Sequence, residues 1–180
     1  MNDTVPNIED VPKNTNPVNR FFQAVSHMVF RPGDFYRHLA ECYEFSSALV
    51  FLFSFSVFYA ALTSIFVTQS KLLFGFIFFL NTFFMPFITA FILYVVTILL
   101  CKNAFTYQSL FGITAYANVV LIAAWIPGLS WVAGIWKFYL IGLGMVKMGR
   151  IKNSKAFVCV LAMASLLLTM IYLLKPILKT

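Results

Sequence analysis

Among the polar residues within the long apolar stretches of this 180-residue chain, Asn81, Asn118 and Lys137 stand out because their side chains are amides or charged. A polar side chain costs free energy in such surroundings, about 2.5–3.5 kcal/mol for a lysine at the centre of a membrane helix. Residues of this kind mark hydrogen bonds between helices or contacts with a polar ligand. All three are therefore candidate contacts for a ligand or a partner protein.

Lys137 has two interpretations. It lies about eight residues from the outer end of its apolar stretch, so its long side chain could extend to the lipid headgroups. Alternatively, it contacts an anionic lipid, an anionic solute or an acidic residue of a partner, because no Asp or Glu follows Glu44 in this chain. Asn81 and Asn118 likewise either line a polar path or form hydrogen bonds between helices.

Two further groups of residues lie near Lys137 in the sequence. Gly134, Gly142 and Gly149 share one face of a helix at about 100° per residue, and small residues allow helices to pack closely. A predicted basic rim on the inner side of the membrane consists of Lys147, Arg150, Lys152 and Lys155. This rim is either a signal of membrane topology or a binding surface for anionic lipids or an acidic partner.

Catalysis is not expected. All six acidic residues precede Phe45, so the apolar part of the chain has no carboxylate to act as acid, base, nucleophile or metal ligand. The two histidines, His27 and His38, lie in the N-terminal part without a nucleophile or ligand cluster nearby. The three cysteines lack the spacing of a zinc site or a disulfide framework. We therefore expect no enzyme, no cofactor and no metal.

The elements that position these residues are transmembrane helices. The chain is 61% hydrophobic and 11% charged, whereas soluble domains have roughly 25% charged residues. We expect an all-α polytopic membrane protein whose domain, at 46–175, is a bundle of five transmembrane helices. These helices are predicted at 47–68, 72–100, 110–126, 129–148 and 156–174. Pro86 predicts a kink in the second helix.

Shorter segments flank this domain. Residues 1–17 are polar and rich in turn formers, and are predicted to be a disordered cytoplasmic tail. Residues 18–45 are predicted to form short amphipathic helices at the membrane interface, the second of them beginning after an N-cap at Asp34. Residues 176–180 form a C-terminal tail.

The positions of the basic residues predict the orientation of the chain. With a cytoplasmic N-terminus, eight Lys and Arg residues lie in inner segments and three in outer segments, and such residues are enriched on the cytoplasmic side. We expect a multi-pass protein of the inner (cytoplasmic) membrane with its C-terminus outside. The net charge of +7 then reflects topology, and no nucleic acid is expected as a partner.

Several short motifs follow one another in a defined order. They are RPGDFY at 31–36, FTYQSL at 105–110, AYA at 115–117, Trp136 with Gly142-Leu143, and SKA at 154–156. Together they resemble bacterial members of the Yip1 domain family, from about Pro17 to the C-terminus. Relatives often have a proline shortly after AYA, where this chain has Asn118-Val119-Val120. The resemblance implies five transmembrane helices and a cytoplasmic N-terminus, but no settled activity.

Two functions remain open. The predicted function is that of a Yip1-like scaffold, a lipid-organising protein or a subunit of a membrane assembly. The alternative is a small transporter or channel subunit for a small or anionic solute, with Asn81, Asn118 and Lys137 along its path. Membrane lipids are the expected partners, with other membrane-protein subunits or further copies of this chain as alternatives.

Overall fold

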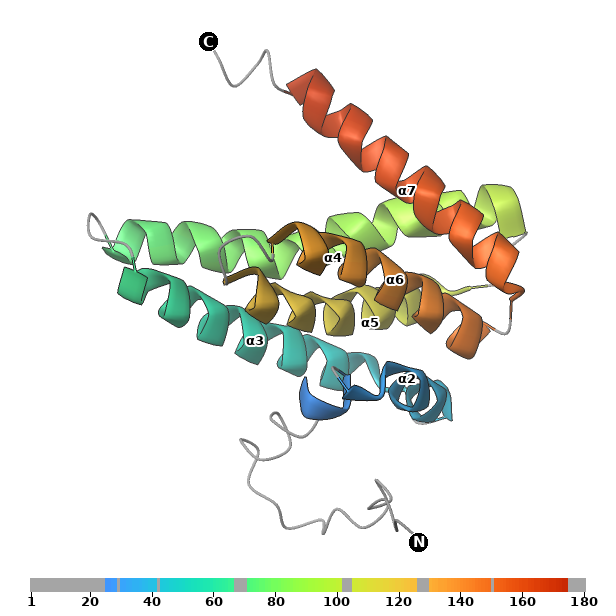
Figure 1. The fold of residues 1–180 in the computed structure, drawn as a ribbon, viewed down its shortest axis with the longest axis horizontal. Coiled ribbons are helices and arrows are strands. Elements are labelled where there is room, and N and C mark those ends of the chain that lie inside the picture. Colours follow the sequence, from blue (N-terminus) through green and yellow to red (C-terminus); the bar gives the residue numbers. More distant parts are fainter. Residues whose placement is uncertain are drawn as a thin grey trace, which may run out of the picture.

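The computed structural model describes residues 25–28, 30–41, 43–66, 71–101, 105–125, 130–149 and 151–174. Within these residues the chain is helical and has no β-strand, as the sequence predicts (Figure 1). The predicted tails at 1–17 and 176–180 lie outside them, as do residues 18–24 of the interfacial segment. Arg150 of the predicted basic rim also lies outside the described residues.

Four of the described helices are long and apolar enough to cross a membrane. They are α3 (Phe45–Phe66), α4 (Lys71–Cys101), α6 (Ser130–Gly149) and α7 (Asn153–Leu174). Each begins and ends within three residues of the range predicted for it. A helix satisfies its own backbone N–H and C=O groups, which is what allows these apolar stretches to stand in lipid.

The third predicted transmembrane helix, at 110–126, is divided in the structure. It starts as an α-helix, α5 (Tyr107–Ala117), and continues as a 3-10 helix, η2 (Asn118–Trp125). Thr106 caps the start of α5, since its Oγ1 accepts the N–H of Ser109 at 3.3 Å. At 1.5 Å and 2.0 Å rise per residue, the 11 and 8 residues extend about 32 Å together. This length matches the roughly 30 Å hydrocarbon core.

α5 forms the centre of the bundle. It packs against α3, α4 and α6, which run beside it in the view of Figure 1. Every residue from Leu110 to Val120 is buried. A helix that is apolar on all its faces needs neighbours on all sides, and here α3, α4 and α6 provide them.

A short helix, α2 (Pro32–Glu41), packs against the side of α6. It begins at Pro32, and not after an N-cap at Asp34 as the sequence suggested, because proline suits the first position of a helix. Asp34 lies instead within the first turn, where a negative charge interacts favourably with the helix dipole. The N–H of Arg31 donates to the carbonyl of His27 at 2.8 Å and links α2 to the preceding helical residues.

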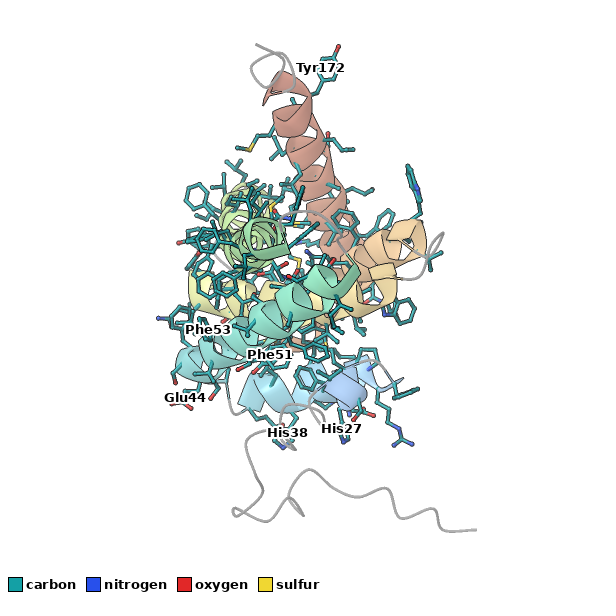
Figure 2. All side chains as sticks on the ribbon, turned by 90° about the vertical axis from the view of Figure 1, so that its left-hand side faces the viewer. His27, His38, Glu44, Phe51, Phe53 and Tyr172 are labelled. Carbon is teal, nitrogen blue, oxygen red and sulfur yellow. The ribbon has the colours of Figure 1, made fainter. Side chains whose placement is uncertain are left out.

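α7 leaves the bundle part-way along its length (Figure 1). Its first half contacts α4 and α6, and Ala156, Cys159 and Met163 are buried there. Beyond Met163 none of its described residues is buried. Figure 2 shows Tyr172 at the far end, away from the other helices.

Candidate functional site

The turn of α4 that contains Pro86 is tied to α5 by the side chain of Asn118. Pro86 has no N–H, so the carbonyl of Thr82, four residues earlier, loses its partner within the helix. Asn118 Nδ2 donates to this carbonyl at 3.3 Å, and both side chains are buried. Asn118 thus fills the hydrogen-bonding position that Pro86 leaves vacant. A hydrogen bond between helices is one of the two alternatives that the sequence offers for Asn118.

Two other polar residues of α5 lie against the same part of α4. The hydroxyl of Thr114 is 3.3 Å from the carbonyl of Pro86 and 2.9 Å from that of Phe111, so its single proton is shared between the two helices. The hydroxyl of Tyr107 lies 3.5 Å from the carbonyl of Phe87. Three backbone carbonyls near Pro86 therefore accept hydrogen bonds from side chains between Tyr107 and Asn118.

The buried polar groups of the bundle are not all satisfied. Asn118 Oδ1 and Ser56 Oγ have no hydrogen-bond partner among the described residues. By contrast, Thr89 and Thr97 donate to carbonyls of their own helix, at Met85 and Tyr94, both at 2.8 Å. Hydroxyl groups in helices satisfy themselves locally in this way.

Tyrosines from the N-terminal segment hold the opposite side of α5. The hydroxyl of Tyr36 donates to the carbonyl of Ile113 at 3.3 Å, and that of Tyr43 donates to the carbonyl of Gln108 at 2.6 Å. The Tyr43 ring occupies the space that a side chain at Gly112 would need. Burial raises the pKa of Tyr36 well above its ordinary value, so its hydroxyl stays a donor.

Replacing Tyr43 by phenylalanine is expected to lower the free energy of unfolding by about 1 kcal/mol, because one hydrogen bond is lost. Burial, and then the nearby Tyr116, raise the pKa of Tyr43 to about 12, against about 10 in an unfolded chain. The neutral phenol therefore stabilises the fold below pH 10, and this contribution disappears as the pH rises through 12. Unfolding of the parent and of Tyr43→Phe in detergent micelles at pH 8 and pH 11.5 measures the contribution of Tyr43. A difference in the free energy of unfolding between the two proteins that is the same at both pH values would contradict the prediction.

The three glycines of the predicted packing face have different surroundings. A Cβ at Gly134 would meet nothing within 4 Å, and one at Gly142 would make ordinary contact with Val160 Cγ2 at 3.7 Å. At Gly149 the Phe105 ring occupies the space. Gly144, which its spacing in the sequence did not single out, packs tightly against α5 and α2, because a Cβ there would lie 2.7 Å from Ile113 Cγ2 and 3.0 Å from Tyr36 Cε1.

Lys137 lies on the face of α6 that packs against the bundle. Its helical neighbours at i − 4, i + 3 and i + 4 are Ala133, Leu140 and Ile141, and all three are buried. Lys137 itself is half-buried. It is therefore a half-buried cation beside buried apolar residues, in a part of the chain that has no carboxylate.

Asn81 lies next to Thr82 in sequence but faces the opposite way. Its side chain is exposed on the outer surface of α4 and forms no hydrogen bond within the described residues. At 1.5 Å per residue, it stands about 15 Å along the helix from Lys71, at the depth of the hydrocarbon core. Asn81 and Asn118 therefore do not lie on one path.

The described members of the basic rim gather where α6 ends and α7 begins. Lys152 and Lys155 are exposed, and Lys147 is half-buried. A Cβ at Gly33 would lie 3.9 Å from Lys147 Cε, which places this lysine beside the first turn of α2.

No catalytic constellation is formed by the described part of the N-terminal segment. Figure 2 shows His27 and His38 below the bundle, pointing away from it. Glu44 accepts a hydrogen bond from Ser47 Oγ at 2.9 Å, and hydrogen bonds from Ser46 and Ser47 lower the pKa of this carboxyl. Glu44 thus interacts with the first turn of α3. The described residues contain no group of three or more His, Cys, Asp or Glu that could hold a metal ion.

The matched region of the chain decides its family. Residues 26–174 match the model of the Yip1 domain. The chain belongs to the Yip1 domain family. A comparison with curated proteins and another with solved structures found no match.

The motifs of this Yip1 domain that resemble the family meet in the structure. RPGDFY contributes Phe35, whose ring packs edge-on against Tyr116 of the AYA motif at 5.0 Å between centroids. FTYQSL contributes the cap at Thr106 and the ring of Phe105 that covers Gly149. Residues of these three motifs thus contribute to the packing of α2 and α6 around α5.

Two contacts of this Yip1 domain were missed at the level of sequence. Thr82 could have been identified, because the residue four positions before an intrahelical proline always loses a donor. Gly144 could not, because nothing in the spacing of α6 shows which of its glycines faces another helix.

Cys101 of α4 and Cys159 of α7 are neighbours, with their Sγ atoms 3.5 Å apart. A disulfide requires about 2.05 Å, so the two sulfur atoms must move closer to each other to form one. Mild oxidation by copper phenanthroline is expected to join the two thiols within one chain, with loss of two hydrogens to the oxidant. Mass spectrometry of peptides after thiol alkylation detects this link, and Cys101→Ser is the control. Alkylation of both thiols after oxidation would show that α4 and α7 do not pack here as described.

Proposed function

We propose that this Yip1-domain protein is a non-catalytic subunit of a membrane protein assembly, acting as a scaffold within the bilayer. Its N-terminus is placed in the cytoplasm and its C-terminus outside, in the inner membrane, on the charge distribution of the chain. The observation that carries the proposal is the contrast between Asn118 and Asn81. The buried amide of Asn118 donates a hydrogen bond to α4, whereas the amide of Asn81 is exposed on the outer surface of α4.

This contrast favours a role in association over one in transport. A transport path needs free polar groups lining the interior, yet Asn118, Thr114 and Thr89 donate to backbone carbonyls. An exposed amide at hydrocarbon depth is, in contrast, a group that another helix could satisfy. The aromatic contacts that join α5 to α2, α3 and α4 support a rigid body suited to a scaffold.

Native mass spectrometry of the full chain in lipid nanodiscs tests the proposal. A stable complex with a protein component, whether another protein or a further copy, is the expected result. A single chain that carries only lipid or a small anion would contradict it.

The transporter alternative has one observation in its favour. Asn118 Oδ1 and Ser56 Oγ are buried without a partner among the described residues, and Lys137 is half-buried on the bundle-facing side of α6. Uptake of radiolabelled small anions into proteoliposomes, with the parent protein and with Lys137→Met, distinguishes the two functions. Uptake that disappears in a folded Lys137→Met protein would favour transport, and no uptake by either protein would favour the scaffold.

The proposed orientation has its own test. In a cysteine-free background, Ser154→Cys introduces an exposed thiol at the start of α7, and Leu72→Cys introduces one at the start of α4. A membrane-impermeant maleimide added to intact cells should label the second protein and spare the first. The reverse pattern would invert the orientation.

A further inference from the structure

The outer face of α4 carries a regular stripe of exposed residues. Between Ile77 and Ile98 the exposed positions of α4 follow steps of four and three, with Met85 as the one addition. Six of these exposed positions are Ile77, Asn81, Phe84, Ile88, Phe91 and Val95. We call these six residues the α4 stripe.

The steps of the α4 stripe are those of a heptad repeat. With Asn81 at position a, Ile88 and Val95 also fall at a, and the remaining three apolar residues fall at d. In parallel two-stranded coiled coils, β-branched residues at a favour dimers, and one asparagine at a specifies the register. The stripe has both features.

Lipid can cover the apolar members of the α4 stripe but not Asn81. A carboxamide has two donor hydrogens and an acceptor oxygen, and the hydrocarbon core offers partners for neither. The exposed hydroxyl of Thr169 on α7 shows the contrast, since it donates to the carbonyl of Ser165 at 2.9 Å. The side chain of Asn81 makes no such bond within the described residues.

We propose that the α4 stripe is a dimer interface, in which Asn81 pairs with Asn81 of a second copy of this chain. A two-fold axis along the membrane normal places the same residue of each copy at the same depth. The carboxamide is complementary to itself, because each group donates to the oxygen of the other. An identical α4 also supplies a stripe of the same period. The proposal deepens the scaffold role and rests on it.

The position of Pro86 within α4 is compatible with this interface. Pro86 is buried and faces α5, and its missing donor is compensated there by Asn118 at the carbonyl of Thr82. The outer side of α4 therefore has no unpaired carbonyl that arises from the proline. The polar side chain of the α4 stripe is that of Asn81.

Cysteine cross-linking in native membranes tests the interface. In a cysteine-free variant of the full chain, Ile77→Cys and Phe84→Cys report on the α4 stripe. Val57→Cys is the matched control, because it is exposed on α3 one turn from Phe53, whose ring contacts Phe79 and Phe83 of α4. Oxidation is expected to give a disulfide-linked dimer from both stripe positions and little from the control.

Asn81→Leu is then added to the Ile77→Cys protein. The dimer fraction measured at several protein-to-lipid ratios should show an association constant lower by about tenfold, the effect of losing hydrogen bonds between membrane helices. Asn81→Gln, which keeps the carboxamide, should retain most of the association. Ser165→Leu removes an exposed hydroxyl from α7 and should change nothing.

The outcomes separate the interface from the scaffold role. Cross-linking at Val57→Cys that equals cross-linking at the stripe would overturn the dimer. So would an unchanged association constant for Asn81→Leu in a protein that remains monodisperse. Cross-links from the stripe to a different protein would also overturn it while leaving the scaffold role intact. Absence of any complex by cross-linking and by native mass spectrometry would remove both.

Discussion

Replacing Gly144 by leucine is expected to lower the free energy of unfolding by about 3 kcal/mol, as overpacking of a tight interface does. A Cβ at Gly144 would already lie 2.7 Å from Ile113 Cγ2 and 3.0 Å from Tyr36 Cε1. The larger side chain must therefore displace α2 or α5. Displacement of α2 would also break the hydrogen bond from Tyr36 to the carbonyl of Ile113.

Gly134→Leu is the matched control on the same helix, because a Cβ there meets nothing within 4 Å. It is expected to cause no loss of stability, since leucine has a higher helix propensity than glycine. Unfolding by sodium dodecyl sulfate in mixed micelles, followed by circular dichroism, measures both variants. Similar losses for the two would show that α2 and α5 do not approach α6 at Gly144.

The second large effect is expected where Asn118 contacts α4 near Pro86. Asn118→Leu leaves the carbonyl of Thr82 without a donor, at a cost of about 2 kcal/mol. In a Pro86→Ala background the new backbone N–H can bond to that carbonyl instead. The same change at Asn118 should then cost little, because the amide is no longer needed by α4.

A double-mutant cycle of Pro86→Ala and Asn118→Leu measures this coupling. The four proteins are unfolded in mixed micelles, and a coupling free energy of about 2 kcal/mol is expected. Thr97→Val is a suitable control, since Thr97 donates within α4 to the carbonyl of Tyr94, and it should not couple to Pro86→Ala. Additive effects at Pro86 and Asn118 would mean that Asn118 does not compensate the proline.

Pro86 of α4 also shows how far reasoning from sequence extends. Pro86 predicts a kink, and the covalent structure of proline identifies Thr82 as the residue whose carbonyl loses its donor. The partner of that carbonyl lies 36 residues away. Asn118 could therefore be named as a candidate, but its role depends on α5 lying against α4 at this level.

The two asparagines show where prediction from sequence stops. Asn81 and Asn118 have similar apolar neighbours in the sequence, yet one faces outward and the other inward. In a soluble helix, polar residues mark the solvent side, and the hydrophobic period identifies the core. In a membrane helix, lipid and protein interior are equally apolar, so this signal is absent.

The sequence alone determined that this is an all-α membrane protein of the Yip1 type, and it set the ends of four long helices within three residues. These features depend on local composition, because an apolar stretch of sufficient length must form a helix in lipid. Tertiary structure decided the rest: the docking of Tyr36 and Tyr43 on α5, the close approach at Gly144 and the divergence of α7. Each of these depends on which side chains meet between helices, and in an apolar solvent composition does not record which side of a helix meets its neighbour.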